Sequence, residues 1–207
     1  MKIFVINPGS TSTKLALYDG MNPVWAESVY HPLAELAQFS RVSEQLEYRK
    51  QHVYSTLQKE NIPLDFDVVI ARGGLLKPTP GGVYRITERI KSDLWNASME
   101  HVSNLAALIA DDIAQRIGCP SFIADPVVTD ELQDVARLTG IPEIPRISIF
   151  HALNSRAVSR RYAARIQKRY EDLNIIVVHL GGGISVSAHH YGRVIDVNNA
   201  LNGEGPF

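Results

Sequence analysis

Two segments of this sequence share one pattern: an apolar run rich in β-branched residues, a turn of glycine and hydroxyl residues, and a second run. The first segment spans residues 2–18 and turns at 7–14, and the second spans 174–189 and turns at 179–185. Such a turn offers backbone N–H groups and hydroxyls to an anion, with little side-chain bulk in the way. The sequence therefore predicts two phosphate-binding hairpins that hold one polyphosphate.

Strands and helices alternate along the rest of the chain. Apolar residues recur at helical spacing in the longer segments, and the run 67–71 is almost wholly apolar, as in a strand covered on both faces. We expect strands at 3–6, 14–18, 23–29, 67–71, 83–86, 121–124, 175–180 and 194–197, and helices at 33–59, 102–117, 131–138 and 152–170. This alternation predicts an α/β fold with helices packed on a mixed sheet.

Residues 174–207 contain the expected strands but no helix to cover them. A sheet without its helices leaves apolar faces and strand edges exposed. We therefore expect one complete domain at 1–173 and the opening strands of a second, nucleotide-binding domain at 174–207. We also expect the sequence to be the N-terminal part of a longer protein.

Composition limits the possible partners. The net charge of −1 gives no basic field for nucleic acid or anionic lipid, and no segment approaches the roughly 20 apolar residues of a membrane span. The one cysteine, Cys119, cannot form an internal disulfide, which favours a buried thiol in a reducing cytoplasm. A run of arginines at 156–169 could bind nucleic acid, but without an aromatic platform it is more typical of a solvated helix face. We expect a cytoplasmic protein with no membrane or nucleic-acid partner.

The first turn has the chemistry of a phosphate site without being a Walker A loop, since no glycine precedes its lysine and a strand follows. Gly9 permits the turn, hydroxyls at 10–13 are donors, and Lys14 supplies a positive charge. Asn7 offers a neutral oxygen to a metal ion or its water. An ordinary hairpin with a polar turn explains the same residues, so both readings stay open.

The second turn carries three consecutive glycines at 181–183. Glycine costs backbone entropy, so a close backbone approach to a ligand is a natural reason for them. A flexible linker is the alternative, and strands on both sides make it a poor fit.

Three further polar residues each follow an expected strand. Arg72 is suited to bidentate binding of a carboxylate or phosphate, and Asp125 to orienting a metal-bound water or acting as a base. His151 can donate to a transferring phosphoryl group. A surface ion pair, a turn cap and a structural histidine are the respective alternatives.

These motifs together resemble the acetokinase family, in its butyrate kinase branch. The resemblance runs along the whole chain, through six motifs in the same order at 7–14, 72–82, 124–128, 149–154, 179–183 and 196–207. It implies a ribonuclease H-like, actin-like ATPase domain with a mixed sheet and flanking helices, and two related domains that close on ATP.

The resemblance also implies roles for single residues. Asn7 would contact Mg²⁺, and Asp125 and His151 would be catalytic, with Asp125 holding the metal shell. Arg72 would hold the acid, although acetate kinases carry their substrate arginine at the position of Val69. The nucleotide phosphates would be bound by Ser10, Ser12, Lys14, His179, Gly181, Gly182 and Gly183.

Two departures matter. Gly182 stands where acetate kinases have asparagine. The family's second catalytic arginine, its adenosine pocket and a metal-contacting glutamate correspond to positions beyond Phe207.

The implied reaction is transfer of the ATP γ-phosphoryl group to a short-chain fatty carboxylate, with butyrate as the acid. An acetate, propionate or branched-chain fatty acid kinase of the same family is the alternative. The implied full-length protein is a homo-oligomer. Two further alternatives stay open: a sugar or glycerol kinase of the same superfamily, and a catalytically incomplete fragment that only folds or binds phosphate weakly.

Overall fold

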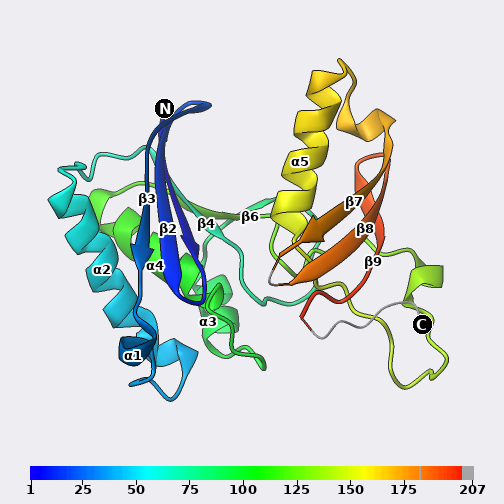
Figure 1. Ribbon diagram of the computed structural model, residues 1–207, viewed down its shortest axis with the longest axis horizontal. Coiled ribbons are helices and arrows are strands. Elements are labelled where there is room, and N and C mark those ends of the chain that lie inside the picture. The colour runs from blue at the N-terminus through cyan, green and yellow to red at the C-terminus, as the bar shows by residue number, and fades with distance from the viewer. Residues whose placement is uncertain (182, 202–207) are drawn as a thin grey trace. The chain divides into compact units, whose positions relative to one another are not determined.

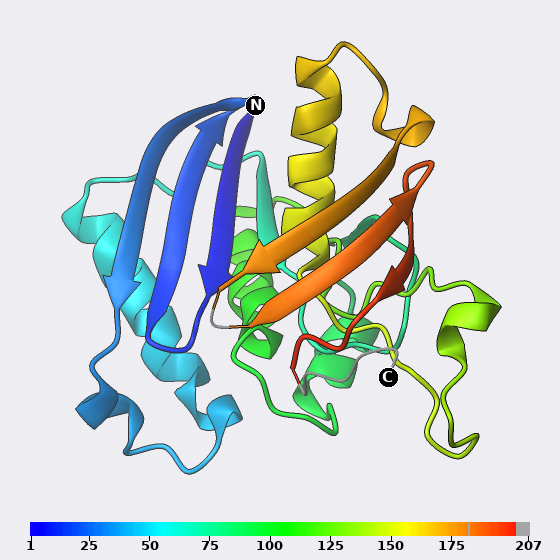
Figure 2. The ribbon, with the colours of Figure 1, turned by 45° about the vertical axis from the view of Figure 1, so that its right-hand side comes forward.

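The computed structural model describes residues 1–181 and 183–201, which fold into two compact units (Figures 1 and 2). Unit 1 comprises Met1–Leu76 and Val83–Ala124, and unit 2 comprises Lys77–Gly82 and Asp125–Phe207. These units differ from the expected domains at 1–173 and 174–207, because residues 125–173 group with the strands that follow them. A domain boundary at residue 173 stays a prediction.

Unit 1 is built on one mixed sheet with the strand order β3-β2-β1-β4-β6-β5. β1, β2 and β3 form an antiparallel meander, whereas β1, β4 and β6 run parallel to one another. All six strands were predicted from the sequence, and they are β1 (Lys2–Pro8), β2 (Ser12–Asp19), β3 (Asn22–Tyr30), β4 (Val68–Arg72), β5 (Val83–Arg85) and β6 (Ser121–Ala124).

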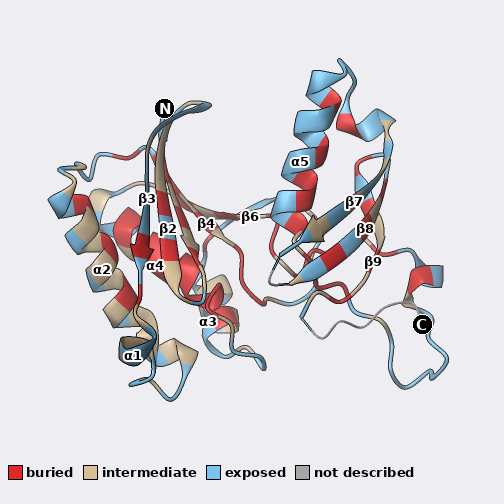
Figure 3. Cartoon of the chain, viewed as in Figure 1, coloured by how far each residue is buried: buried red, intermediate tan, exposed pale blue. Residues whose placement is uncertain are grey.

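Helices α2 (Leu46–Lys59) and α4 (Asn104–Ile117) pack on one face of this sheet, behind β1–β3 in Figure 2. The buried core lies between them and the sheet, as Figure 3 shows for α4 and β4. α4 ends where expected, because Gly118 adopts φ +73°, a left-handed conformation that glycine reaches without strain. The opposite face of the meander carries the polar residues discussed below.

The expected single helix at 33–59 is wrong. The segment forms α1 (Leu33–Leu36), a 3₁₀ turn η1 (Val42–Gln45) and then α2. The Glu44 carboxylate accepts hydrogen bonds from the backbone N–H groups of Ser40 (2.9 Å) and Arg41 (3.3 Å), which satisfies donors at the start of a new helical segment. Helix α3 (Glu88–Trp95) was not predicted. Its start is marked by Thr87, whose Oγ1 accepts from Ile90 N.

Unit 2 contains the three-stranded antiparallel sheet β7-β8-β9 and helix α5 (Ala152–Arg165), which packs against β7. The predicted second hairpin is confirmed as β7 (Asn174–Leu180) and β8 (Ile184–His190), followed by β9 (Arg193–Val197). As expected for a sheet without a second helical layer, large apolar side chains of the hairpin are exposed (Figure 3): Ile176, Val178, Leu180, Ile184 and Val186.

Two expected helices of unit 2 need correction. The segment 131–138 contains only a 3₁₀ turn, η2 (Asp134–Arg137), because Gln133 N donates to Ile195 O (3.0 Å) and the Asp130 carboxylate is bound to Arg137 (2.8 Å). The helix expected at 152–170 stops at Arg165, and Gln167 turns the chain with φ +56° before the 3₁₀ turn η3 (Tyr170–Asp172). Among the described residues, no helix is long and apolar enough to cross a membrane.

Candidate active site

The backbone carbonyl groups of the first predicted turn accept hydrogen bonds from other residues of unit 1. Arg49 of α2 donates from Nη1 to Gly9 O (3.0 Å) and from Nη2 to Ser10 O (2.9 Å). The backbone N–H of His31 donates to Thr11 O (2.8 Å). Three consecutive carbonyl dipoles are thus held by donors inside the fold.

The amide groups of the same turn are left for a ligand. Gly9 N donates to Ser12 O (2.6 Å), but the N–H groups of Ser10 and Thr11 have no acceptor among the residues that the structure describes. The Ser10 and Ser12 hydroxyls likewise lack a partner there. Successive free N–H groups and hydroxyls at one turn form an anion-binding site.

One hydroxyl of this turn is not available. Thr13 is fully buried, and its Oγ1 lies 2.8 Å from His31 Nε2 and accepts from Arg49 Nη1 (3.3 Å). Thr13 supports the base of the turn, so its expected role as a donor to an anion is wrong. Burial and the positive charge of Arg49 lower the pKa of His31 to about 4, so this ring is neutral at physiological pH.

Asn7 and Lys14 lie directly opposite each other on β1 and β2, and Ser28 of β3 is the next partner across the sheet. Their row borders an open depression of about 440 Å³ whose lining includes Val5 and Ala16. Lys14 is exposed and has no ion-pair partner in the described part of the chain. An amide, an ammonium and a hydroxyl therefore share one face of the meander.

Arg72 ends β4, at the same edge of the sheet as the first turn. The parallel pairing of Ile6 with Ala71 brings Asn7 and Arg72 to neighbouring positions at the carboxyl ends of β1 and β4. Open α/β sheets bind ligands at this edge. The half-buried guanidinium makes no hydrogen bond or ion pair with any described residue, and burial lowers its pKa. A partly buried cation without an internal acid is suited to an external anion.

His101 was missed by the sequence analysis, where a lone histidine between two helices carries no signal. Burial and then the positive charge of Arg72 lower the pKa of His101, which places the two side chains in one electrostatic environment. Ser103 N donates to His101 Nδ1 (3.2 Å), so a neutral ring carries its proton on Nε2. This ring is half-buried in the loop before α4.

Asp125 directly follows β6 and begins the longer of the two segments of unit 2. It adopts φ +35°, a left-handed conformation that non-glycine residues rarely take and that is often found at functional sites. One carboxylate oxygen accepts from Gly82 N (2.9 Å) and lies 3.2 Å from Arg156 Nε, and the other lies 3.6 Å from Arg160 Nη1. A carboxylate held between two arginines in this way is suited to electrostatic positioning.

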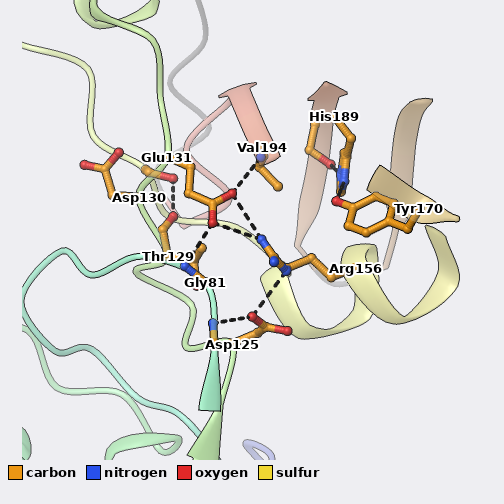
Figure 4. Close-up of polar contacts among 12 residues, drawn as sticks. Gly81, Asp125, Thr129, Asp130, Glu131, Arg156, Tyr170, His189 and Val194 are labelled. Carbon is orange, nitrogen blue, oxygen red and sulfur yellow. Dashed lines mark hydrogen bonds and ion pairs between the residues drawn. The ribbon is translucent and has the colours of Figure 1, made fainter. Parts of the chain in front are cut away.

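Arg156 of α5 is the centre of this cluster (Figure 4). It lies between Asp125 and Glu131, with 3.1 Å between its Nη1 and Glu131 Oε2. Glu131 also accepts from Gly81 N (3.0 Å) and Val194 N (2.8 Å), so one guanidinium and two carboxylates join four segments of unit 2: residues 81–82, residues 125–131, α5 and β9. A Cβ on Gly81 would lie 2.4 Å from Arg156 Nη1, which explains the glycine there.

The expected solvated stripe at 156–169 is therefore wrong for Arg156, whose side chain is only 9% exposed. Arg160, Arg161 and Arg165 are exposed as expected. To the right of Arg156 in Figure 4, the buried pair of Tyr170 and His189 is joined through Tyr170 Oη and His189 Nδ1 at 2.5 Å. Burial, and to a smaller degree the positive charge of Arg156, lower the pKa of His189 to about 4.

His151 and His179 are brought together by the fold. Their rings stack with centroids 3.7 Å apart and planes 9° from parallel. His151 precedes α5, and its Nδ1 lies 3.0 Å from Ser185 Oγ, while His179 Nδ1 lies 2.9 Å from the Asn154 side-chain amide. Both rings thus have fixed orientations at the end of the second hairpin.

The glycines of the second turn have a packing reason. A Cβ on Gly183 would lie 3.2 Å from His151 Cε1 and 3.3 Å from Ala200 O, and a Cβ on Gly181 would lie 3.1 Å from His179 Nε2. Glycine therefore lets both rings approach the turn closely. Gly182 lies outside the described residues.

The predicted site residues form two sets. Unit 1 holds Asn7, Ser10, Ser12, Lys14 and Arg72, and unit 2 holds Asp125, His151, His179, Gly181 and Gly183. No group of three or more His, Cys, Asp or Glu side chains is arranged to hold a metal ion within residues 1–181 and 183–201. Asn7 in unit 1 offers an amide oxygen and Asp125 in unit 2 an ion-paired carboxylate, and each is a kind of oxygen that Mg²⁺ accepts beside phosphate and water ligands.

Comparison with known proteins now adds to this geometry. Residues 144–202 match the model of the acetokinase family. A probable butyrate kinase of Phocaeicola vulgatus is 70% identical over 207 residues, which is all of this chain and 58% of that protein. Butyrate kinase 2 of Clostridium acetobutylicum is 50% identical over 208 residues, again covering 100% of this chain and 58% of the relative. The chain is therefore similar along its whole length to butyrate kinases, and over residues 144–202 to the acetokinase family.

Solved structures confirm the fold expected for an acetokinase. Porphyromonas gingivalis acetate kinase superposes with a TM-score of 0.68 at 17% identity, over 96% of this chain and 57% of that one. A propionate kinase from Francisella tularensis gives 0.66 at 18% identity, over 97% and 57%. The chain spans 58% of the length of the two curated relatives.

Proposed function

We propose that this sequence belongs to a kinase that transfers the γ-phosphoryl group of ATP to a short-chain fatty carboxylate, with butyrate as the preferred acid. The names of the relatives support this choice, since both are described as butyrate kinases or probable butyrate kinases. The reaction would take place in the cytoplasm, where ATP and Mg²⁺ are available, in a homo-oligomer of full-length chains.

The observation that carries the proposal is that unit 1 presents two anion-binding groups at one edge of its sheet, neither with an internal acidic partner among the described residues. The turn of Ser10 and Thr11 offers free amides, and Arg72 offers a half-buried guanidinium. A carboxylate kinase has to bind two anions, the polyphosphate and the acid.

The chemistry asks little of a base. A carboxylate oxygen attacks the γ-phosphorus, the bond from that phosphorus to the β,γ-bridging oxygen breaks, and ADP leaves with that electron pair. The acid is already ionised, so no proton has to move, and the protein contributes positioning and charge neutralisation. Bound Mg²⁺ would supply neutralisation of the phosphate oxygens.

Each residue then has one task. Arg72 holds the acid in the bidentate manner of guanidinium and carboxylate. Lys14 and the first turn bind phosphate oxygens, and His151 donates to the transferring phosphoryl group. Asp125 and Asn7 would hold the metal with its water, and His179 with its glycine turn would form a second phosphate site.

The proposal is tested by acyl phosphate formation. Hydroxylamine traps acyl phosphates as hydroxamates, which separates this activity from that of a sugar or glycerol kinase. The assay compares the chain alone with a chimera in which residues 1–207 are followed by the C-terminal remainder of the Phocaeicola vulgatus relative. We expect hydroxamate from the chimera with butyrate above acetate, propionate and branched-chain acids, and none from the chain alone. Transfer to an alcohol without hydroxamate from any acid would refute the proposal.

A further inference from the structure

Arg49 is the most deeply buried charged side chain at the first turn. It projects from α2, is 0% exposed, and uses its guanidinium in four hydrogen bonds. Nη1 donates to Gly9 O (3.0 Å) and Thr13 Oγ1 (3.3 Å), Nη2 to Ser10 O (2.9 Å), and Nε to the Gln45 side-chain oxygen (3.0 Å). The planar fork matches two successive carbonyl groups, which an ammonium could not do.

All four acceptors of Arg49 are neutral oxygens. No carboxylate forms an ion pair with it in the part of the chain that the structure describes, and the nearby acid Glu35 accepts instead from Tyr48 Oη (2.7 Å). Arg156 is the contrasting case, since it is similarly buried but lies between two carboxylates.

A buried charge without a counter-charge costs several kcal/mol unless something else compensates it. Burial lowers the pKa of Arg49 to about 10, which still leaves the guanidinium protonated at neutral pH. Carbonyl dipoles offset part of the cost. They cannot supply a negative charge, so no described residue balances this positive charge, and the Ser10 and Thr11 amides of the turn above it have no acceptor among the described residues.

We propose that Arg49 is a positioning residue of the phosphate turn: its guanidinium holds the Gly9 and Ser10 carbonyls inward, and its positive charge is balanced by the bound polyphosphate. The inference rests on the proposed function of this turn. Because the carbonyls are fixed from below, the Ser10 and Thr11 amides are oriented before the ligand arrives, which lowers the entropy cost of binding. The charge acts through the turn and does not touch the ligand.

The experiment measures ligand affinity and local structure in the chain and in the chimera. Arg49→Met removes both the planar guanidinium and its charge. Arg49→Lys keeps the positive charge but loses the planar guanidinium. Gln45→Leu removes only the acceptor of Arg49 Nε. Lys50→Met is the matched control, because Lys50 neighbours Arg49 on α2 but pairs with Glu47 and Asp112. The probes are tripolyphosphate, ATP with Mg²⁺, and adenosine, measured by calorimetry below each variant's melting temperature.

We expect Arg49→Met to weaken tripolyphosphate binding at least tenfold, Arg49→Lys to lie between it and the wild type, and Lys50→Met to stay within twofold. Adenosine binding should not change in any variant. In wild-type spectra the Ser10 and Thr11 amide resonances should shift on adding tripolyphosphate, and in Arg49→Met the shift should be lost. In the chimera, KM for ATP should rise in Arg49→Met while KM for butyrate stays within threefold.

The outcomes separate the two proposals. If neither the wild-type chain nor the wild-type chimera binds tripolyphosphate, the first turn is not a phosphate site, and the proposed function is refuted with it. A wild type that binds and a folded Arg49→Met variant that binds equally well would overturn the role of Arg49 alone. If Arg49→Met does not fold, Arg49→Lys and Gln45→Leu decide, and unchanged tripolyphosphate affinity in both would overturn the inference.

Discussion

Replacing Arg156 with methionine should destabilise unit 2 strongly, because it removes the guanidinium that two buried carboxylates share. Glu131 is left without an ion-pair partner among the described residues, and Asp125 keeps only Arg160, at 3.6 Å. The side chains of Asp125 and Glu131 are only 7% and 10% exposed. Removing one partner of a buried ion pair typically costs about 3–5 kcal/mol. Asp125 keeps its hydrogen bond from Gly82 N, and Glu131 keeps those from Gly81 N and Val194 N. We therefore expect the free energy of unfolding to fall by an amount within this range. That is a large part of a typical unfolding free energy of roughly 5–15 kcal/mol.

The loss should depend on pH with a definite sign. In Arg156→Met the orphaned carboxyl groups are more stable protonated, so the folded variant takes up protons more readily than its unfolded chain. The loss of unfolding free energy relative to the wild type is therefore largest near pH 7. It becomes smaller as the pH falls toward about 4, where ordinary carboxyl groups take up protons. The double variant Arg156→Met with Glu131→Gln should recover about 1–2 kcal/mol, because it removes the carboxylate charge that Arg156→Met leaves without a cation.

The assay has to report on unit 2. Both tryptophans, Trp25 and Trp95, lie in unit 1, so their fluorescence in urea serves as an internal reference. Hydrogen exchange at the Val194 amide, which donates to Glu131, reports the cluster directly. Arg161→Met is the control, an exposed arginine of the same helix, and should change stability by less than about 0.5 kcal/mol. A loss below about 1 kcal/mol in Arg156→Met at pH 7, or one that grows on acidification, would refute the reasoning.

Three further predictions concern single residues. His31 has a pKa of about 4 in the folded chain against 6.5 for an ordinary histidine, so on acidification the unfolded chain takes up this proton first. The free energy of unfolding should therefore fall by about 2 kcal/mol between pH 7 and pH 5 because of this group. In His31→Gln the urea midpoint should change less with pH over that range, and an unchanged dependence on pH would contradict this. Gly183→Ala should displace the His151 ring and lower the free energy of unfolding by about 1–2 kcal/mol. The displacement should be seen as a shifted proton resonance of His151. Gly140→Ala is the control and should change neither quantity, because a Cβ there meets nothing within 4 Å. Arg72→Met in the chimera should raise KM for butyrate at least tenfold and KM for ATP less than threefold; equal increases would argue against carboxylate binding by Arg72.

Much of the sheet was predictable because its signals are local. β-branched runs of four to nine residues bounded by turn residues mark strands whatever surrounds them, and both hairpins and the parallel strands β4 and β6 were found in this way. Gly118 likewise announces the end of α4 through its own backbone preference. The residues at the strand ends followed, since Asn7 and Arg72 take their places from the parallel pairing.

The errors arise where a distant partner decides the structure. The segment 131–138 has a helical pattern, but Glu131 and Gln133 are bound to β9, more than sixty residues later in the chain. Arg156 and Arg49 each sit in helices with many charged residues, where an arginine is usually a solvated one. Little in the adjacent sequence marks their burial, because most of their acceptors come from segments that lie far away in the chain.

The two buried arginines show how the same residue type can serve structure or ligand binding. Arg156 has two acids within 3.2 Å, so its charge is already compensated and its removal should be felt mainly as lost stability in unit 2. Arg49 has four neutral acceptors, so its charge is uncompensated and its removal should be felt mainly as lost affinity for an anion. Added tripolyphosphate should accordingly raise the melting temperature of the wild type and of Lys50→Met but have little effect on Arg49→Met, because only a folded state with the cation in place gains from the ligand.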